Sequence, residues 1–63
     1  MTDITWDDEI CGEAANCFRI GTDSVGNAYI AVRGAEDHYI TDSREALRDL
    51  IREIKAGKAD HLL

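Results

Sequence analysis

The sequence predicts a small α+β domain in which an antiparallel sheet of three to four strands packs against one C-terminal helix. Short runs of alternating apolar and polar residues, typical of half-buried strands, occupy the first two thirds of the chain. The stretches between these runs have hairpin length, whereas parallel pairing needs longer crossovers. One apolar stripe at helical spacing occupies the last third, so that one sheet face and the helix can cover each other.

The strands are expected in four places. Residues 4–6 (ITW) form either a short first strand or an N-terminal arm, in which Trp6 is the apolar anchor. The other strands are expected at residues 17–20 (CFRI), 28–33 (AYIAVR) and 38–41 (HYIT). The stretch between the first two strands is interpreted as a loop, because it shows no alternation of apolar and polar residues.

The helix has recognisable ends. Asp42 or Ser43 is the expected N-cap, and Glu45 is placed to complete a capping box with Asp42. Gly57 is a natural residue to follow the last helical turn. The apolar positions recur at i, i+3, i+4 and i+7, and they are Leu47, Leu50, Ile51 and Ile54. We expect this stripe to pack on the sheet.

The length of the chain limits how stable its core can be. Its 63 residues form one domain, 1–63, in which residues 1–5 and 58–63 are expected to be flexible ends. A core of this size gains about as much free energy from apolar burial as it loses in conformational entropy. Small domains of this kind are stabilised by disulfides, metals or self-association, so one of these is expected.

The charge of the chain excludes some classes of partner. Thirteen Asp and Glu residues against seven Lys and Arg residues give an acidic protein with a net charge of −6. Residues 1–42 carry −7, whereas residues 43–63 carry +1. Because an acidic chain is repelled by phosphate backbones, direct binding of nucleic acid is not expected. A basic protein is the more natural partner.

The composition is that of a globular protein without a membrane segment. Hydrophobic residues make up 44% of the chain, and the longest apolar run is far shorter than a membrane span. The first residues, MTDITWDDE, are acidic, whereas a secretory signal is basic and then apolar. The expected location is therefore the cytoplasm, with no membrane contact.

Cys11 and Cys17 stand six positions apart and allow four interpretations. A zinc site is disfavoured by this spacing, because only His38 and His61 could complete it. A disulfide would close a short loop but would meet a reducing cytosol. A catalytic cysteine needs a neighbouring base, for which the distant His38 gives little support. The favoured interpretation makes Cys17 a small buried strand residue and Cys11 a loop residue.

The sheet face opposite the helix is the candidate surface for a partner or a second copy. Alternation places a mixed set of side chains there: Cys17, Arg19, Tyr29, Ala31, Arg33, Tyr39 and Thr41. The sequence has no glycine-rich phosphate loop or metal-spaced cluster, and so short a chain has little room for a pocket. We therefore expect no enzyme, no catalytic residue, no metal and no cofactor.

Several motifs, taken in order, resemble a known family. NCFRIG is followed by AYIAVRGAEDHYIT and then by DSREALRDLIREIKAGKAD. Their order and spacing, over about residues 6–60, are similar to those of the actinobacterial family named domain of unknown function 397, which includes BldB-like developmental regulators. The matching positions are Trp6, Asn16-Cys17, Ile30-Ala31-Val32-Arg33 and Lys55-Ala56-Gly57-Lys58.

The resemblance implies a small regulatory binding module. Proteins of this family are typically encoded beside helix-turn-helix transcription regulators, and some of them self-associate. The resemblance also implies that Cys17 is a packing residue and Cys11 an individual feature. The alternative is a toxin–antitoxin or phage-defence component, which would also act by protein–protein contact but on a different partner. The residues expected to bind the regulator, or a second copy in a homodimer, are Trp6, Arg19, Tyr29, Arg33 and Tyr39.

Overall fold

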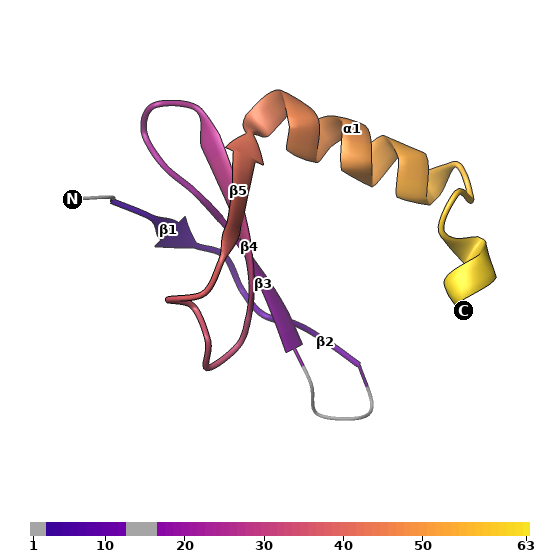
Figure 1. Ribbon diagram of the computed structural model, residues 1–63, viewed down its shortest axis with the longest axis horizontal. Coiled ribbons are helices and arrows are strands. Elements are labelled where there is room, and N and C mark those ends of the chain that lie inside the picture. The colour runs from indigo at the N-terminus through magenta and orange to yellow at the C-terminus, as the bar shows by residue number, and fades with distance from the viewer. Residues whose placement is uncertain (1–2, 13–16) are drawn as a thin grey trace.

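The fold is shown by a computed structural model, which describes residues 3–12 and 17–63 and confirms the expected α+β class (Figure 1). The described residues form five strands: β1 (Thr5–Trp6), β2 (Ile10–Cys11), β3 (Cys17–Thr22), β4 (Asn27–Val32) and β5 (Ile40–Ser43). The helix α1 (Arg44–Lys55) follows β5 directly, and a 3-10 helix, η1 (Asp60–Leu62), lies near the C-terminus.

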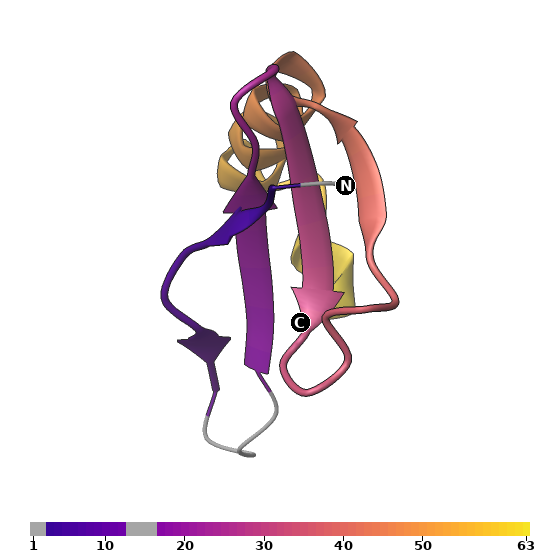
Figure 2. The same ribbon diagram turned by 90° about the vertical axis from the view of Figure 1, so that its left-hand side faces the viewer.

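The strands form one antiparallel sheet, in which β3, β4 and β5 make a meander. The order is β1-β3-β4-β5, and β2 also pairs with β3 (Figure 2). β2 lies in the stretch expected to be a loop and pairs Ile10 with Phe18 and Cys11 with Cys17. A strand of two residues cannot be predicted from the sequence pattern, because an alternation of apolar and polar residues can be recognised only over several residues.

Local signals set the two ends of α1. Ser43 is the N-cap, and its hydroxyl oxygen accepts a hydrogen bond from the backbone N–H of Ala46 at 3.1 Å. At the other end the backbone N–H of Ala56 donates to the carbonyl of Arg52 at 2.9 Å. Gly57 follows with φ of +92°, a conformation that glycine adopts without steric cost.

Among the described residues, no helix has both the length and the apolar character needed to cross a membrane.

The side of the sheet away from α1 contains the best-buried part of the molecule. We call this side the aromatic face, and its members are Trp6, Cys17, Arg19, Gly21, Tyr29, Ala31 and Tyr39. The ring centroids of Tyr29 and Tyr39 are 4.9 Å apart, and that of Trp6 lies 6.4 Å from Tyr29 and 6.5 Å from Tyr39, all edge to face. This geometry is the favoured one for aromatic pairs, so the three rings form a small core on one sheet face.

The predicted layer of helix on sheet is more open than expected. Figure 1 shows α1 running away from the sheet after β5 instead of lying along it. As a result Leu50, Ile51 and Ile54 are 45%, 42% and 50% exposed, so the prediction that this stripe is buried is wrong for these residues. The reason is the direct junction between β5 and α1: with no residue between Ser43 and Arg44, the helix has no loop in which to turn back.

Gly21 is the position that allows Trp6 to lie close to the sheet. It pairs with Trp6 on β1 and with Tyr29 on β4. A Cβ atom at Gly21 would lie 2.7 Å from Cγ2 of Ile4 and 2.8 Å from Cε3 of Trp6. No real Cβ tolerates such distances, so the indole ring requires glycine beneath it.

Gly21→Ala is therefore expected to displace Trp6 and to lower the free energy of unfolding by about 1–3 kcal/mol, the usual cost of overpacking. Denaturant unfolding followed by the fluorescence of the single tryptophan measures this change. Gly12→Ala is the matched control, because nothing lies within 4 Å of a Cβ atom at Gly12. Equal stabilities of the two variants would contradict the close approach of Trp6 to β3.

Candidate functional site

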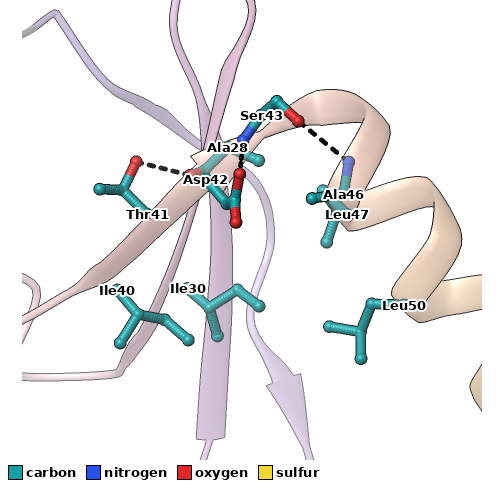
Figure 3. Close-up of a pocket in the computed structure, with 9 residues that line it drawn as sticks. All are labelled: Ala28, Ile30, Ile40, Thr41, Asp42, Ser43, Ala46, Leu47 and Leu50. Carbon is teal, nitrogen blue, oxygen red and sulfur yellow. Dashed lines mark hydrogen bonds between the residues drawn. The ribbon is translucent and has the colours of Figure 1, made fainter.

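A hollow lies between α1 and the sheet (Figure 3). β4 and β5 form one wall, and the first two turns of α1 form the other. The residues that line it are Ala28, Ile30, Ile40, Thr41, Asp42, Ser43, Ala46, Leu47 and Leu50. Figure 3 shows the side chains of Ile30 and Leu50 pointing into the same space from opposite walls. We call this hollow the groove.

The polar groups of the groove are occupied by local hydrogen bonds. The hydroxyl of Thr41 donates to the carbonyl of Ala28 at 3.0 Å, and a carboxylate oxygen of Asp42 accepts the backbone N–H of Ser43 at 2.7 Å. The groove has a volume of about 240 Å³, which is below the range of about 300–1,000 Å³ for small-molecule pockets. It therefore suits a few apolar side chains of a docking protein.

Apolar side chains continue beyond the groove over the same side of the sheet. They form two cross-strand rows, Ile10–Phe18–Val32 and Ile20–Ile30–Ile40, which we call the helix face. Phe18, Val32 and Ile40 are 57%, 47% and 69% exposed. A contiguous exposed apolar surface marks a site of protein interaction. The helix face, the groove and the exposed stripe of α1 together form the candidate docking surface.

Four of the five residues expected to bind a partner come together on the aromatic face. The guanidinium of Arg19 lies 6.0 Å from the ring centroid of Trp6, and the Trp6 ring in turn lies 6.4 Å from that of Tyr29 and 6.5 Å from that of Tyr39. A guanidinium nitrogen of Arg19 also lies 3.3 Å from a carboxylate oxygen of Glu36, which is in the loop between β4 and β5. These contacts close the aromatic face with side chains of the same chain.

The structure reverses the expected exposure of the two sheet faces. Tyr29 is only 5% exposed, so it cannot reach a partner in this conformation. Tyr39 is 37% exposed, and Arg33, which directly follows β4, has a nitrogen 3.4 Å from a carboxylate oxygen of Glu9. Because Trp6 covers the aromatic face while α1 leaves the helix face, the candidate docking surface moves to the side predicted to be the core.

Asp23 is a buried polar residue that sequence reasoning did not single out. Its carboxylate accepts hydrogen bonds from the hydroxyl of Tyr29 at 2.6 Å, from the side-chain amide of Asn27 at 3.1 Å, and from the backbone N–H groups of Val25 and Asn27. The bond from Tyr29, followed by that from the Asn27 backbone, lowers the pKa of Asp23 to about 2. The sequence did contain a signal for this role, which is Asp23 four residues before Asn27 in the β3–β4 turn. Aspartate in a turn commonly accepts hydrogen bonds from the backbone N–H groups of the residues that follow it.

The two cysteines correct the favoured interpretation, because Cys11 and Cys17 form a disulfide. Cys11 is exposed and Cys17 is 4% exposed, so Cys17 is buried as expected but is not an unpaired thiol. A carboxylate oxygen of Glu9 lies within 4.8 Å of both sulfur atoms. Since each sulfur is bonded to the other, neither offers a thiolate to a metal. His38 instead contacts Asp37, with 3.6 Å between a ring nitrogen and a carboxylate oxygen.

The hydrogen bonds at Asp23 predict a loss of stability in acid. Its pKa is 3.8 without these bonds and about 2 with them, so the stabilisation is complete above pH 3.8 and is lost as the pH falls towards 2. Asp23→Asn is expected to melt at a lower temperature than the unmodified protein at neutral pH, with a difference that shrinks across this pH range. Thermal unfolding at several pH values measures it.

Asp37→Asn is the control for this experiment, because the side chain of Asp37 is 80% exposed. It is expected to melt like the unmodified protein at every pH. If the difference between the unmodified protein and Asp23→Asn were as large near pH 2 as at neutral pH, the carboxylate would not be the group that stabilises the fold.

Comparisons with known proteins do not add to this geometry. No family model, curated protein or solved structure matches the chain.

Proposed function

We propose that this chain is a small non-enzymatic protein-binding module that forms a homodimer through the docking surface and modulates a helix-turn-helix transcription regulator. The observation that carries the proposal is the open groove with the exposed helix face and α1 stripe beside it. The polar groups of the groove already have hydrogen-bond partners within the chain. An apolar surface of this kind is therefore stabilised mainly when another apolar surface covers it and removes it from water.

The exposed area of the chain supports a second copy as the occupant of the groove. The chain has 5127 Å² of accessible surface for a mass of 7.0 kDa. A folded monomer of that mass exposes about 4,000 Å². The surplus of about 1,100 Å² exceeds the about 800 Å² that each partner contributes to a standard interface. Pairing two copies therefore brings the exposed area close to that of an ordinary folded protein.

The same chain carries both halves of a complementary contact. In the proposed dimer the exposed α1 residues of one copy, Leu50, Ile51 and Ile54, lie on the helix face of the other, and the reverse contact forms by symmetry. The segment that includes α1, residues 43–63, carries a charge of +1, whereas residues 1–42 carry −7. Approach of each helix to the acidic sheet of the other copy is thus electrostatically favoured.

The regulatory target rests on the resemblance to the family of BldB-like proteins. The acidic surface supports it, because a DNA-binding regulator presents basic residues that are attracted to residues 1–42. We place this contact in the cytoplasm and assign it to the assembled dimer. The chain then acts by protein contact, without touching bases.

Leu50→Gln is expected to weaken the noncovalent dimer of the chain with its internal Cys11–Cys17 disulfide intact about tenfold, because a polar group then enters the apolar contact. Leu50 is 45% exposed in the single chain, so its replacement leaves the fold of the monomer intact. Sedimentation velocity over a wide range of concentrations measures the dissociation constant. Val25→Gln is the matched control, since Val25 is 79% exposed on the β3–β4 turn and outside the docking surface. A protein that stays monomeric at every concentration would overturn the proposed dimer.

Binding to the regulator is tested with the helix-turn-helix protein encoded beside this gene. Calorimetric titration with the purified dimer is expected to give a measurable heat that falls as salt rises, because acidic and basic surfaces meet. The experiment is repeated with Leu50→Gln, which is expected to bind more weakly in proportion to its monomer content. A gene neighbourhood without such a regulator, or a titration without heat, would refute this target.

A further inference from the structure

The disulfide holds one edge of the docking surface in place. It joins Cys11 on β2 to Cys17 on β3, and the adjacent pair, Ile10 with Phe18, belongs to the helix face. The bond therefore fixes Ile10, which is 59% exposed, next to Phe18, which is 57% exposed. The first row of the helix face, Ile10–Phe18–Val32, is complete only while β2 is attached.

Noncovalent contacts hold β2 weakly. Its ladder consists of two residue pairs, which is too short to be stable against the entropy of the free chain. The preceding backbone bond is that of the Asp7 N–H to the carbonyl of Ile20, at 2.8 Å, and it belongs to the β1 side. The ion pair between Glu9 and Arg33 has side chains that are 39% and 53% exposed, and such pairs contribute little.

We propose that thiol–disulfide exchange at Cys11–Cys17 controls the docking surface: the oxidised chain carries the complete surface, and the reduced chain releases β2 and loses Ile10 from it. This inference rests on the proposed dimer, because it concerns the regulation of the same surface. Disulfides in cytosolic proteins are usually transient or redox-sensing, so the proposed location and the observed bond agree only if the bond is exchangeable.

The exposures of the two cysteines set the order of the exchange. The thiolate of a dithiol reductant attacks Sγ of Cys11, which is exposed, while Cys17 is 4% exposed and leaves as a thiolate that takes up a proton. The second thiol of the reductant then attacks the mixed disulfide and releases the thiol of Cys11. The reductant becomes a disulfide, and the chain has gained two electrons and two protons.

Release of β2 changes the surface in two ways. The side chain of Ile10 leaves the row beside Phe18, so the contact with the second copy loses apolar area at its edge. The N-terminal half of β3 also loses its strand neighbour on that side. Both effects weaken the dimer, whereas the ring contacts of Trp6, Tyr29 and Tyr39, which involve neither cysteine, keep the monomer folded.

The test compares the oxidised protein, the protein reduced with dithiothreitol, and the double variant Cys11→Ser with Cys17→Ser. Sedimentation velocity is expected to show dimers about tenfold weaker for the reduced protein and for the double variant. Adding dithiothreitol to the double variant serves as the control and is expected to change nothing. Amide hydrogen exchange is expected to accelerate at residues 10 and 11 on reduction, with unchanged protection in β4.

A further variant links the redox effect to the surface. Oxidised Ile10→Gln is expected to dimerise about as weakly as the reduced protein, and its reduction is expected to have a much smaller effect. Oxidised and reduced dimers of equal affinity would overturn the switch and leave the proposed dimer standing, as would wild-type affinity of oxidised Ile10→Gln. An oxidised protein that remains monomeric would overturn both.

Discussion

The packing of Trp6 across Gly21 onto Tyr29 is the contact on which the rest of this small structure depends. It fastens the N-terminal strand β1 to the meander and, with Tyr39, creates the buried centre of the sheet. The hydrogen bond of Tyr29 to Asp23 extends this centre into the β3–β4 turn, where Asp23 also holds backbone N–H groups. One sheet face and one turn thus share a single stabilised unit.

A chain with four aromatic residues can close only one face of its sheet in this way. The other face depends on α1, which contacts the sheet through its first two turns and then departs from it. The direct β5–α1 junction at Ser43 sets that departure, and it leaves apolar surface on both walls of the groove. The protein has consequently more exposed area than its mass explains, which is a strong physical reason to expect association.

The proposed dimer contact and the proposed redox control involve the same edge of the sheet. The Cys11–Cys17 bond joins the buried Cys17 of β3 to β2, the strand that supplies Ile10 to the helix face, and neither cysteine takes part in the ring contacts of Trp6, Tyr29 and Tyr39. In the proposed switch, a change in this bond alters the docking surface while the fold persists. Such a separation between a stable unit and a weakly held edge is what a switchable interface requires, since regions that move are drawn from the less stable parts of a structure.

The secondary-structure elements of the protein could be predicted from residue patterns, whereas the side chains that are buried in the folded chain could not. Alternation in β3 and β4, the cap at Ser43 and the glycine after α1 are decided within a few residues, so the sequence was sufficient for the α+β class and for the division of side chains between two faces. The face that is covered, the pairing of β2 and the bond between Cys11 and Cys17 depend on contacts between distant segments. The covered face is decided by the packing of Trp6 on β3 and by the direction in which α1 leaves β5. The β2 pairing and the disulfide likewise join segments that lie apart in the chain, because burial and pairing depend on neighbours in space.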